Sequence, residues 1–169
     1  MNKKRAFALS LFLAFVVAAD QLTKALVRAE IPYGTAVPVL PGVVQLTHVE
    51  NTGAAFSILG GARWFFLALV VVFLAVAAVL IRRKIISKPA ELWALAAICG
   101  GALGNAVDRA VSGTVTDMIE PLFINFAVFN VADIFITCGA VLLGVAILFF
   151  DRDSKQNSVH IKQEGSKRE

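Results

Sequence analysis

The stretch FINFAVFNVADIFITCGAVLLGVAILFF, from Phe123 to Phe150, decides which class of fold this chain adopts. Its apolar run is long enough to cross the hydrocarbon core of a bilayer as a helix, which takes about 20 residues. Two side chains, Asn130 and Asp133, do not suit a plain membrane anchor. A carboxylate at membrane depth is costly and usually faces a protein interior or a water-filled site, so Asp133 needs a reason to be there.

The composition of the whole chain also indicates a membrane protein. Of its 169 residues, 58% are apolar and 17% are charged, and the mean hydropathy is +0.77. These values lie outside the range of ordinary soluble domains. The length allows one domain, 1–151, and the polar segment 152–169 is predicted to be a disordered cytoplasmic tail.

Four uncharged apolar runs predict four membrane-spanning helices. They are Ala6–Ala19, Trp64–Ile81, Leu92–Val107 and Ile134–Phe150. With their flanks they place helices at about 6–28, 63–82, 91–110 and 128–150, separated by outer loops at about 29–62 and 111–127. The first outer loop contains turn residues and then a β-branched run, VVQLTHV, which predicts short strands. We therefore expect an all-α membrane protein, a four-transmembrane-helix bundle with a small β-rich extracytoplasmic loop subdomain.

Basic residues indicate how the chain is oriented. They cluster before the first span, between the second and third spans, and after the fourth. By the positive-inside rule, both termini and the middle loop are cytoplasmic. The N-terminus also fits a cleavable signal peptide. However, apolar residues continue at helical spacing beyond Asp20, which favours an uncleaved first helix; they are Leu22, Ala25, Leu26 and Ala29.

Three spans each carry an aspartate at a similar depth. Asp20, Asp108 and Asp133 lie about 22 to 27 Å of helix rise from the cytoplasmic edge. Asp117, in the short second outer loop, must return to nearly the same level. Asp20 can pair with Lys24, four residues later on the same helix face. For Asp108 two partners are open, the adjacent Arg109 or Lys24 across the helices.

Asp117 and Asp133 have no such sequence-local cation if Arg109 holds Asp108. Two carboxyl groups placed close together share a proton, so one can act as general base on a water while the other polarises a carbonyl. This is the chemistry of an aspartic protease, and Asn130 is placed to orient Asp133 or a substrate peptide group.

Two other classes of function remain open. A proton-coupled transporter would spread ionisable groups across the whole membrane, whereas the inner halves of these spans carry none. A membrane scaffold would not need paired carboxylates. No HExxH motif or close cysteine pair occurs, and Cys99 and Cys138 fit packing positions, so neither a metal nor a cofactor is expected.

Five motifs, in order, resemble those of the bacterial lipoprotein signal peptidases, also called signal peptidase II. The motifs are DQLTK (20–24), NTGAAF (51–56), GGALGNAVDR (100–109), VTDMI (115–119) and FNVAD (129–133). The resemblance implies a membrane aspartic endopeptidase that removes the signal peptide from diacylglyceryl-modified prolipoproteins, just before the lipidated cysteine. It also implies a bacterial cytoplasmic (inner) membrane location, with the active site near the outer leaflet.

The resemblance also implies roles for individual residues. Asp117 and Asp133 match the family's catalytic pair. The predicted supporting and substrate-binding residues are Asp20, Lys24, Asn51, Gly53, Gly101, Asn105, Asp108, Arg109, Asn130 and Ala132. Thr23 stands where serine is common, and the segment between the two catalytic positions is short. We expect a monomer whose partners are lipid-modified prolipoprotein substrates and membrane lipids, with no nucleic acid.

Overall fold

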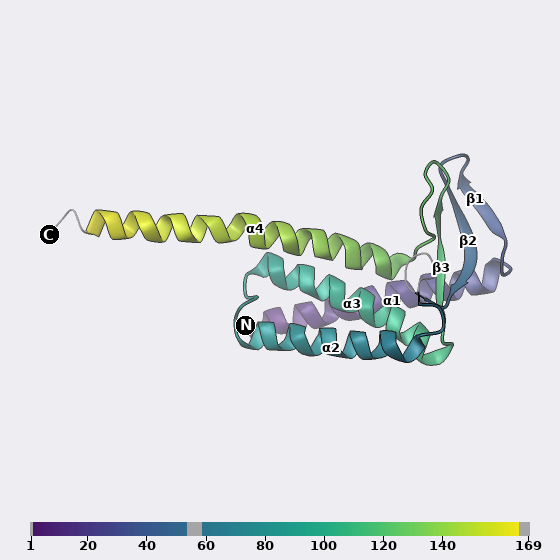
Figure 1. The fold of residues 1–169 in the computed structure, drawn as a ribbon, viewed down its shortest axis with the longest axis horizontal. Helices are drawn as coiled ribbons and strands as arrows, with labels where there is room; N and C mark the ends of the chain where they lie inside the picture. Colours follow the sequence, from purple (N-terminus) through teal and green to yellow (C-terminus); the bar gives the residue numbers. More distant parts are fainter. Residues whose placement is uncertain (1, 54–58, 166–169) are drawn as a thin grey trace.

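The computed structural model describes residues 2–53 and 59–165, and the side chains of 150–165 are not part of that description. Within these residues, four helices are long and apolar enough to cross a membrane, and a three-stranded sheet lies at one end of the bundle (Figure 1). The chain runs α1 (Lys3–Glu30), β1 (Ala36–Leu40), β2 (Val44–Asn51), α2 (Arg63–Arg82), α3 (Pro89–Val111), β3 (Val115–Pro121) and α4 (Val131–Gly165). The predicted fold class is confirmed.

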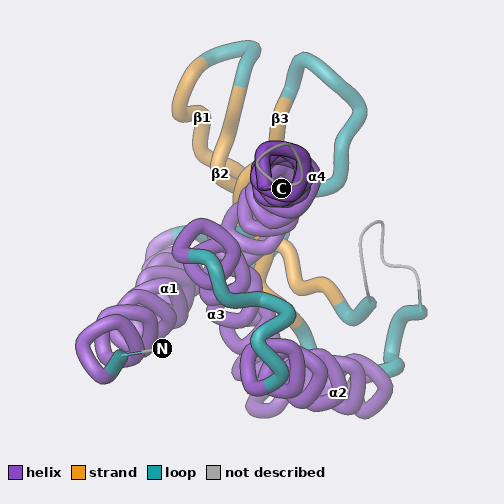
Figure 2. Tube along the Cα trace, turned by 90° about the vertical axis from the view of Figure 1, so that its left-hand side faces the viewer, coloured by secondary structure: helices purple, strands orange, loops and turns teal. Residues whose placement is uncertain are grey.

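Helix α3 is the centre of the bundle. It packs against α1, α2 and α4, and it lies between them when the helices are seen nearly end-on (Figure 2). In α3, 61% of the most apolar window is buried, whereas the other three spans have 11 to 17% buried and face outward. Small residues allow this close packing, because a Cβ added to Gly100 would lie 2.9 Å from Val16 Cβ on α1.

The sheet is antiparallel in the order β1-β2-β3, so β2 joins the first outer loop to the second. The register pairs Val49 with Asp117 and Asn51 with Val115. Because side chains alternate along a strand, Asn51 and Asp117 point to the same face of the sheet. The start of α1 and the far end of α4 both lie away from the sheet, toward the opposite end of the molecule (Figure 1).

The fourth helix differs from its predicted limits at both ends. It begins at Val131 rather than at residue 128, because Phe129 is still extended and forms a backbone bridge with Ile119 of β3. It continues to Gly165, through much of the segment for which composition predicts disorder. Extending a helix that is already formed needs no new nucleation, and this favours the helical continuation. Residues 54–56 of the NTGAAF motif lie outside the described residues.

Candidate active site

Strand β3 brings Asp117 into the interior of the protein at the junction of sheet and bundle. Its side chain is only 3% exposed. One carboxyl oxygen, Oδ2, accepts a hydrogen bond of 3.0 Å from Asn51 Nδ2 on the neighbouring strand β2. The other, Oδ1, accepts a hydrogen bond of 2.7 Å from Asn130 Nδ2, just before α4. The strand register and the start of α4 therefore hold Asp117 from both sides.

Asp133 belongs to a reciprocal cap at the start of α4. The Asn130 side-chain oxygen accepts from the Asp133 backbone N–H at 3.0 Å, and the Asp133 carboxylate accepts from the Asn130 backbone N–H at 3.2 Å. This is a capping box, in which the residue before the helix and the third helical residue satisfy each other's free N–H groups. The positive end of the helix dipole also favours a carboxylate at this position.

Two buried amides connect the carboxyl groups. Asn105 of α3 donates from Nδ2 to Asp133 Oδ1 at 2.8 Å. Asn130 Nδ2 donates both to Asp117 Oδ1 and, at 3.1 Å, to Asn105 Oδ1. The side chain of Asn130 is completely buried. Asp117 and Asp133, from separate elements, thus belong to one hydrogen-bonded unit.

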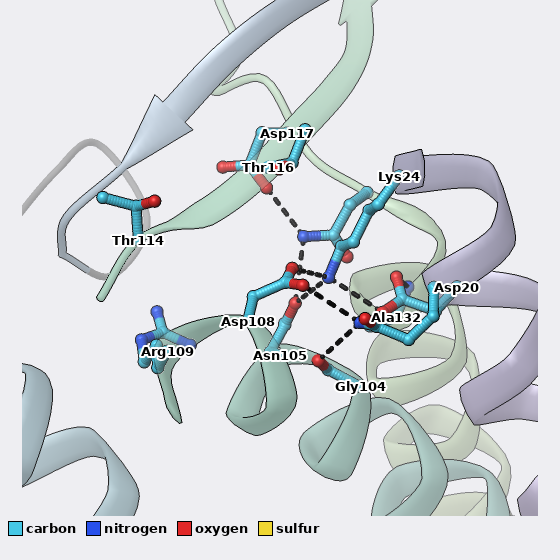
Figure 3. A network of polar contacts seen from close by, with 12 residues as sticks. Asp20, Lys24, Gly104, Asn105, Asp108, Arg109, Thr114, Thr116, Asp117 and Ala132 are labelled. Atoms are coloured by element: carbon cyan, nitrogen blue, oxygen red, sulfur yellow. Dashed lines mark hydrogen bonds and ion pairs between the residues drawn. The ribbon is translucent and has the colours of Figure 1, made fainter. Parts of the chain in front are cut away.

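Lys24 lies at the centre of the polar contacts beside this unit (Figure 3). Its ammonium group forms ion pairs of 2.8 Å with Asp20 Oδ2 and Asp108 Oδ2, and it donates a hydrogen bond of 2.8 Å to Asn105 Oδ1. Lys24 and Asp20 are fully buried. The intrahelical pair of Asp20 and Lys24 is present as predicted, and of the two partners left open for Asp108, the structure selects Lys24.

Arg109 does not hold Asp108, so the assumption that it does is wrong. Adjacent residues of a helix point in different directions, because each residue turns by about 100°. Arg109 instead donates from Nη2 to the carbonyl oxygen of Gly53 at 2.7 Å, and its guanidinium lies 4.6 Å from the ring centre of Phe66 on α2. Arg109 therefore links the end of β2 to α2 and α3.

Close backbone packing holds the start of α4 against α1 and α3. The backbone N–H of Ala132, one of the free donors of the first helical turn, donates to Asp20 Oδ1 at 3.0 Å. A Cβ on Gly101 would overlap the carbonyl oxygen of Ala132. A Cβ on Gly104 would lie 2.5 Å from Asp20 Oδ2. The glycines of α3 thus allow the polar groups on the three helices to reach one another.

Burial alters the acidity of Asp117. Loss of hydration raises the pKa of its carboxyl from 3.8 to about 6, and repulsion from Asp133 acts in the same direction. The hydrogen bonds from Asn51 and Asn130 oppose this rise, as does the positive charge of Lys24. A carboxyl group with this pKa gains and loses a proton close to neutral pH, as acid–base catalysis requires.

The two carboxyl groups line a cavity of about 600 Å³. The volume falls in the range of small-molecule sites. Its polar lining includes Asn51, Gly53, Asn105, Arg109, Asp117, Asn130 and Asp133. Its apolar lining includes Phe66, Phe126, Val128 and Ile134. The cavity therefore combines polar groups suited to a peptide bond with apolar walls.

A second polar cluster behind β3 was not predicted. Glu50 of β2 lies on the face of the sheet opposite to the one that carries Asp117. It accepts hydrogen bonds from Thr114 and Thr116. Arg28 donates to Thr116 Oγ1 at 2.8 Å. Burial raises the pKa of Glu50, but the hydrogen bonds from the two threonines and His48 outweigh it, so the pKa is lowered.

Gln21 was also missed, although it lies within the DQLTK motif. Its side-chain amide donates to Asp108 Oδ1 and to the Gly104 carbonyl oxygen, both at 3.1 Å. Its position next to Asp20 was the signal in the sequence that could have marked Gln21 as a site residue. Gln21 adds a further link between α1 and α3 at the level of the ion pairs.

Fold and site together define a class: a multi-pass membrane protein whose interior holds two carboxyl groups beside a cavity of about 600 Å³. The sequence profile described as Signal peptidase (SPase) II matches residues 12–149. The chain belongs to the signal peptidase II family, which implies that it is a peptidase in the processing of lipoprotein signal peptides.

Individual relatives agree. A protein named lipoprotein signal peptidase from Streptococcus pyogenes serotype M6 is 41% identical over 148 residues, covering 86% of this chain and 94% of the relative. A serotype M5 homologue of the same name is equally similar, at 41% over 148 residues. A bacterial membrane enzyme solved by the in meso method at 2.3 Å resolution superposes with a TM-score of 0.79 at 31% identity, covering 83% of this chain and 87% of that one.

Proposed function

We propose that this protein is an aspartic endopeptidase that uses Asp117 and Asp133 to remove the signal peptide from diacylglyceryl-modified prolipoproteins. The observation that carries the proposal is the link between the two carboxyl groups through Asn130, at the wall of one cavity. No cofactor or metal enters the reaction, since the pair itself supplies acid and base. The substrate class follows from the family, whose members bear the name lipoprotein signal peptidase.

The pair works with one proton shared between its members. The ionised carboxylate takes a proton from a bound water, whose oxygen forms a bond to the scissile carbonyl carbon, while the protonated carboxyl gives its proton to the carbonyl oxygen. Collapse of this tetrahedral intermediate breaks the C–N bond. The protonated member of the pair gives its proton to the leaving nitrogen, and a hydroxyl of the intermediate gives its proton to the other carboxylate as the new C=O bond forms, so the pair again holds one proton. Burial and repulsion from Asp133 raise the pKa of Asp117 to about 6, and this supports a pair that carries one shared proton close to neutral pH.

The location of the site suits a substrate that stays in the membrane. The sheet and Asp117 lie at the end of the bundle away from the start of α1 and the far end of α4 (Figure 1). The opposite end of the bundle, where α1 begins and α2 ends, carries the basic residues Lys3, Lys4, Arg82, Arg83 and Lys84. The positive-inside rule therefore makes that end cytoplasmic. The cavity then lies near the outer leaflet of the bacterial inner membrane, where the acyl chains of a lipidated cysteine are held. We propose a monomer, with membrane lipids and prolipoproteins as its partners.

A cleavage assay tests the proposal. Purified protein in lipid is mixed with a diacylglyceryl-modified prolipoprotein, and the products are identified by mass spectrometry to locate the cut. We expect cleavage just before the lipidated cysteine, and a loss of at least about 10³-fold in kcat for Asp117→Asn and for Asp133→Asn. An unlipidated substrate should not be cut.

Glu120→Gln is the matched control. Glu120 is also an acidic residue of β3, but its carboxylate accepts a hydrogen bond from Gln45 at 2.8 Å and does not line the cavity. The control should cut at the parent rate. Comparable cleavage by folded Asp117→Asn or Asp133→Asn protein would remove the pair from the mechanism, and an intact lipidated substrate with the parent would refute the peptidase itself.

A further inference from the structure

Lys24 connects to the carboxyl pair by hydrogen bonds only through another residue, although its positive charge also acts on Asp117 through space. Its ammonium group has no place in the lining of the cavity, and its contacts are with Asp20, Asp108 and Asn105. It is fully buried, so water does not screen its charge. The question is what a fully desolvated cation does beside a catalytic site that it does not touch.

Hydrogen-bond polarity gives an answer for Asn105. An ammonium group can only donate, so the Asn105 side chain must turn its oxygen, not its nitrogen, toward Lys24. The amide nitrogen is then directed at Asp133, to which it donates at 2.8 Å. A single donor-only group therefore fixes which end of Asn105 faces the carboxylate.

The same logic extends to Asn130. Because the oxygen of Asn105 also accepts from Asn130 Nδ2 at 3.1 Å, Asn130 must present its nitrogen on that side. The second hydrogen of that nitrogen is donated to Asp117, and the Asn130 oxygen is left to accept the backbone N–H of Asp133. The orientation of both amides follows from Lys24.

We propose that Lys24 is a positioning residue that fixes the orientation of Asn105 and Asn130, so that both amides offer donors to the carboxyl pair and stabilise its singly ionised state. The proposal rests on the proposed function and deepens it, by naming what sets the charge state of the pair. If Asn105 turned over, its oxygen would face Asp133, and two acceptors in contact disfavour the ionised carboxylate.

Other charged groups lie on the elements packed around the pair. They are Asp20, Lys24 and Arg28 on α1, Glu50 on β2, Asp108 and Arg109 on α3, and the pair itself on β3 and α4. A test must therefore separate the orientation of the amides from the net charge. Replacing Lys24 with methionine and Asp108 with asparagine together removes one positive and one negative charge, so the net charge of the cluster is unchanged.

The first experiment compares Lys24→Met/Asp108→Asn with the parent. We expect kcat to fall about 10²-fold with KM nearly unchanged, because the geometry of the pair is lost while the cavity lining is kept. The acidic limb of the pH–rate profile should move to higher pH. A purely structural role predicts less folded protein with the pH midpoint unchanged, and that result would overturn the proposal.

A double-mutant cycle then tests whether the effect passes through Asn105. Leucine at position 105 has neither a donor nor an acceptor, so Asn105→Leu removes the connection. In that background, Lys24→Met/Asp108→Asn should cause no further shift of the pH midpoint. Additive shifts would mean that Lys24 acts on the pair directly, and the proposal would fail.

The titration can also be followed without any substrate. Difference infrared spectroscopy of the carboxyl stretch, recorded over a pH series, reports protonation of the pair in the parent and in each variant. If the Lys24→Met/Asp108→Asn protein does not fold, Asn105→Leu is measured in its place. Arg28→Met is the control, since Arg28 is a cation of the same helix that contacts Asp108 and Thr116 rather than Asn105. Arg28→Met should leave the midpoint close to that of the parent, and a shift as large as that of the Lys24 variant would overturn the proposal. Because this measurement needs no cleavage, failure of the positioning role and failure of the peptidase function are distinguished.

Discussion

Replacing Asp117 with asparagine should make the protein more stable at neutral and alkaline pH. Folding raises the pKa of Asp117 from 3.8 to about 6, so the folded protein keeps this proton where the unfolded chain has lost it. Stability therefore falls as pH rises from about 4 to about 6, and it stays low above that. Each pKa unit corresponds to about 1.4 kcal/mol, so the loss amounts to about 3 kcal/mol.

The free energy of unfolding would be measured in detergent by denaturant titration between pH 4 and pH 8. The informative quantity is the stability of Asp117→Asn minus that of the parent at each pH. We expect this difference to rise by about 2.5 kcal/mol between the ends of the series, because part of the change lies below pH 4, and to level off above about pH 7. A pH-independent difference for Asp117→Asn would refute the assignment of a raised pKa to this carboxyl.

Two further substitutions test the packing and the link to the first outer loop. Gly104→Ala should lower the free energy of unfolding by about 1–3 kcal/mol, as measured in the same titration, because the new Cβ would lie 2.5 Å from Asp20 Oδ2. Gly144→Ala, which has nothing within 4 Å, is its control and should not destabilise the protein. Arg109→Lys should reduce kcat/KM about tenfold without lowering the melting temperature, since lysine cannot bond the Gly53 carbonyl and lie on the Phe66 ring in the same way. A melting temperature that falls in parallel with activity would show that Arg109 serves stability instead.

Hydropathy and charge predicted the bundle because each span, taken by itself, must be long and apolar enough to cross the bilayer. The common depth of Asp20 and Asp108 follows from counting residues along separate helices, and their joint ion pairs with Lys24 agree with it. Contacts between helices depend instead on how each helix is rotated. Composition could not decide between Arg109 and Lys24 as the partner of Asp108.

The start of α4 could have been placed more accurately. Asn130 followed three residues later by Asp133 is a possible capping-box pattern, and it marks the helix start at Val131. The apolar run upstream concealed this signal, because residues of the second outer loop are also apolar. The orientation of the amides of Asn105 and Asn130 was beyond sequence analysis, since it depends on contacts between residues far apart in the chain.

The ion pair within α1 also bears on how the protein is made. Asn105, the α3 partner of Lys24, is 81 residues further along the chain, and at ordinary translation rates its synthesis takes on the order of ten seconds longer. During that interval an unpaired lysine in the bilayer would be costly. Asp20, one helical turn away at 2.8 Å, lets α1 enter the membrane as a locally neutral segment before α3 exists. The same aspartate that later holds the start of α4 thus serves first as a companion charge for the nascent helix.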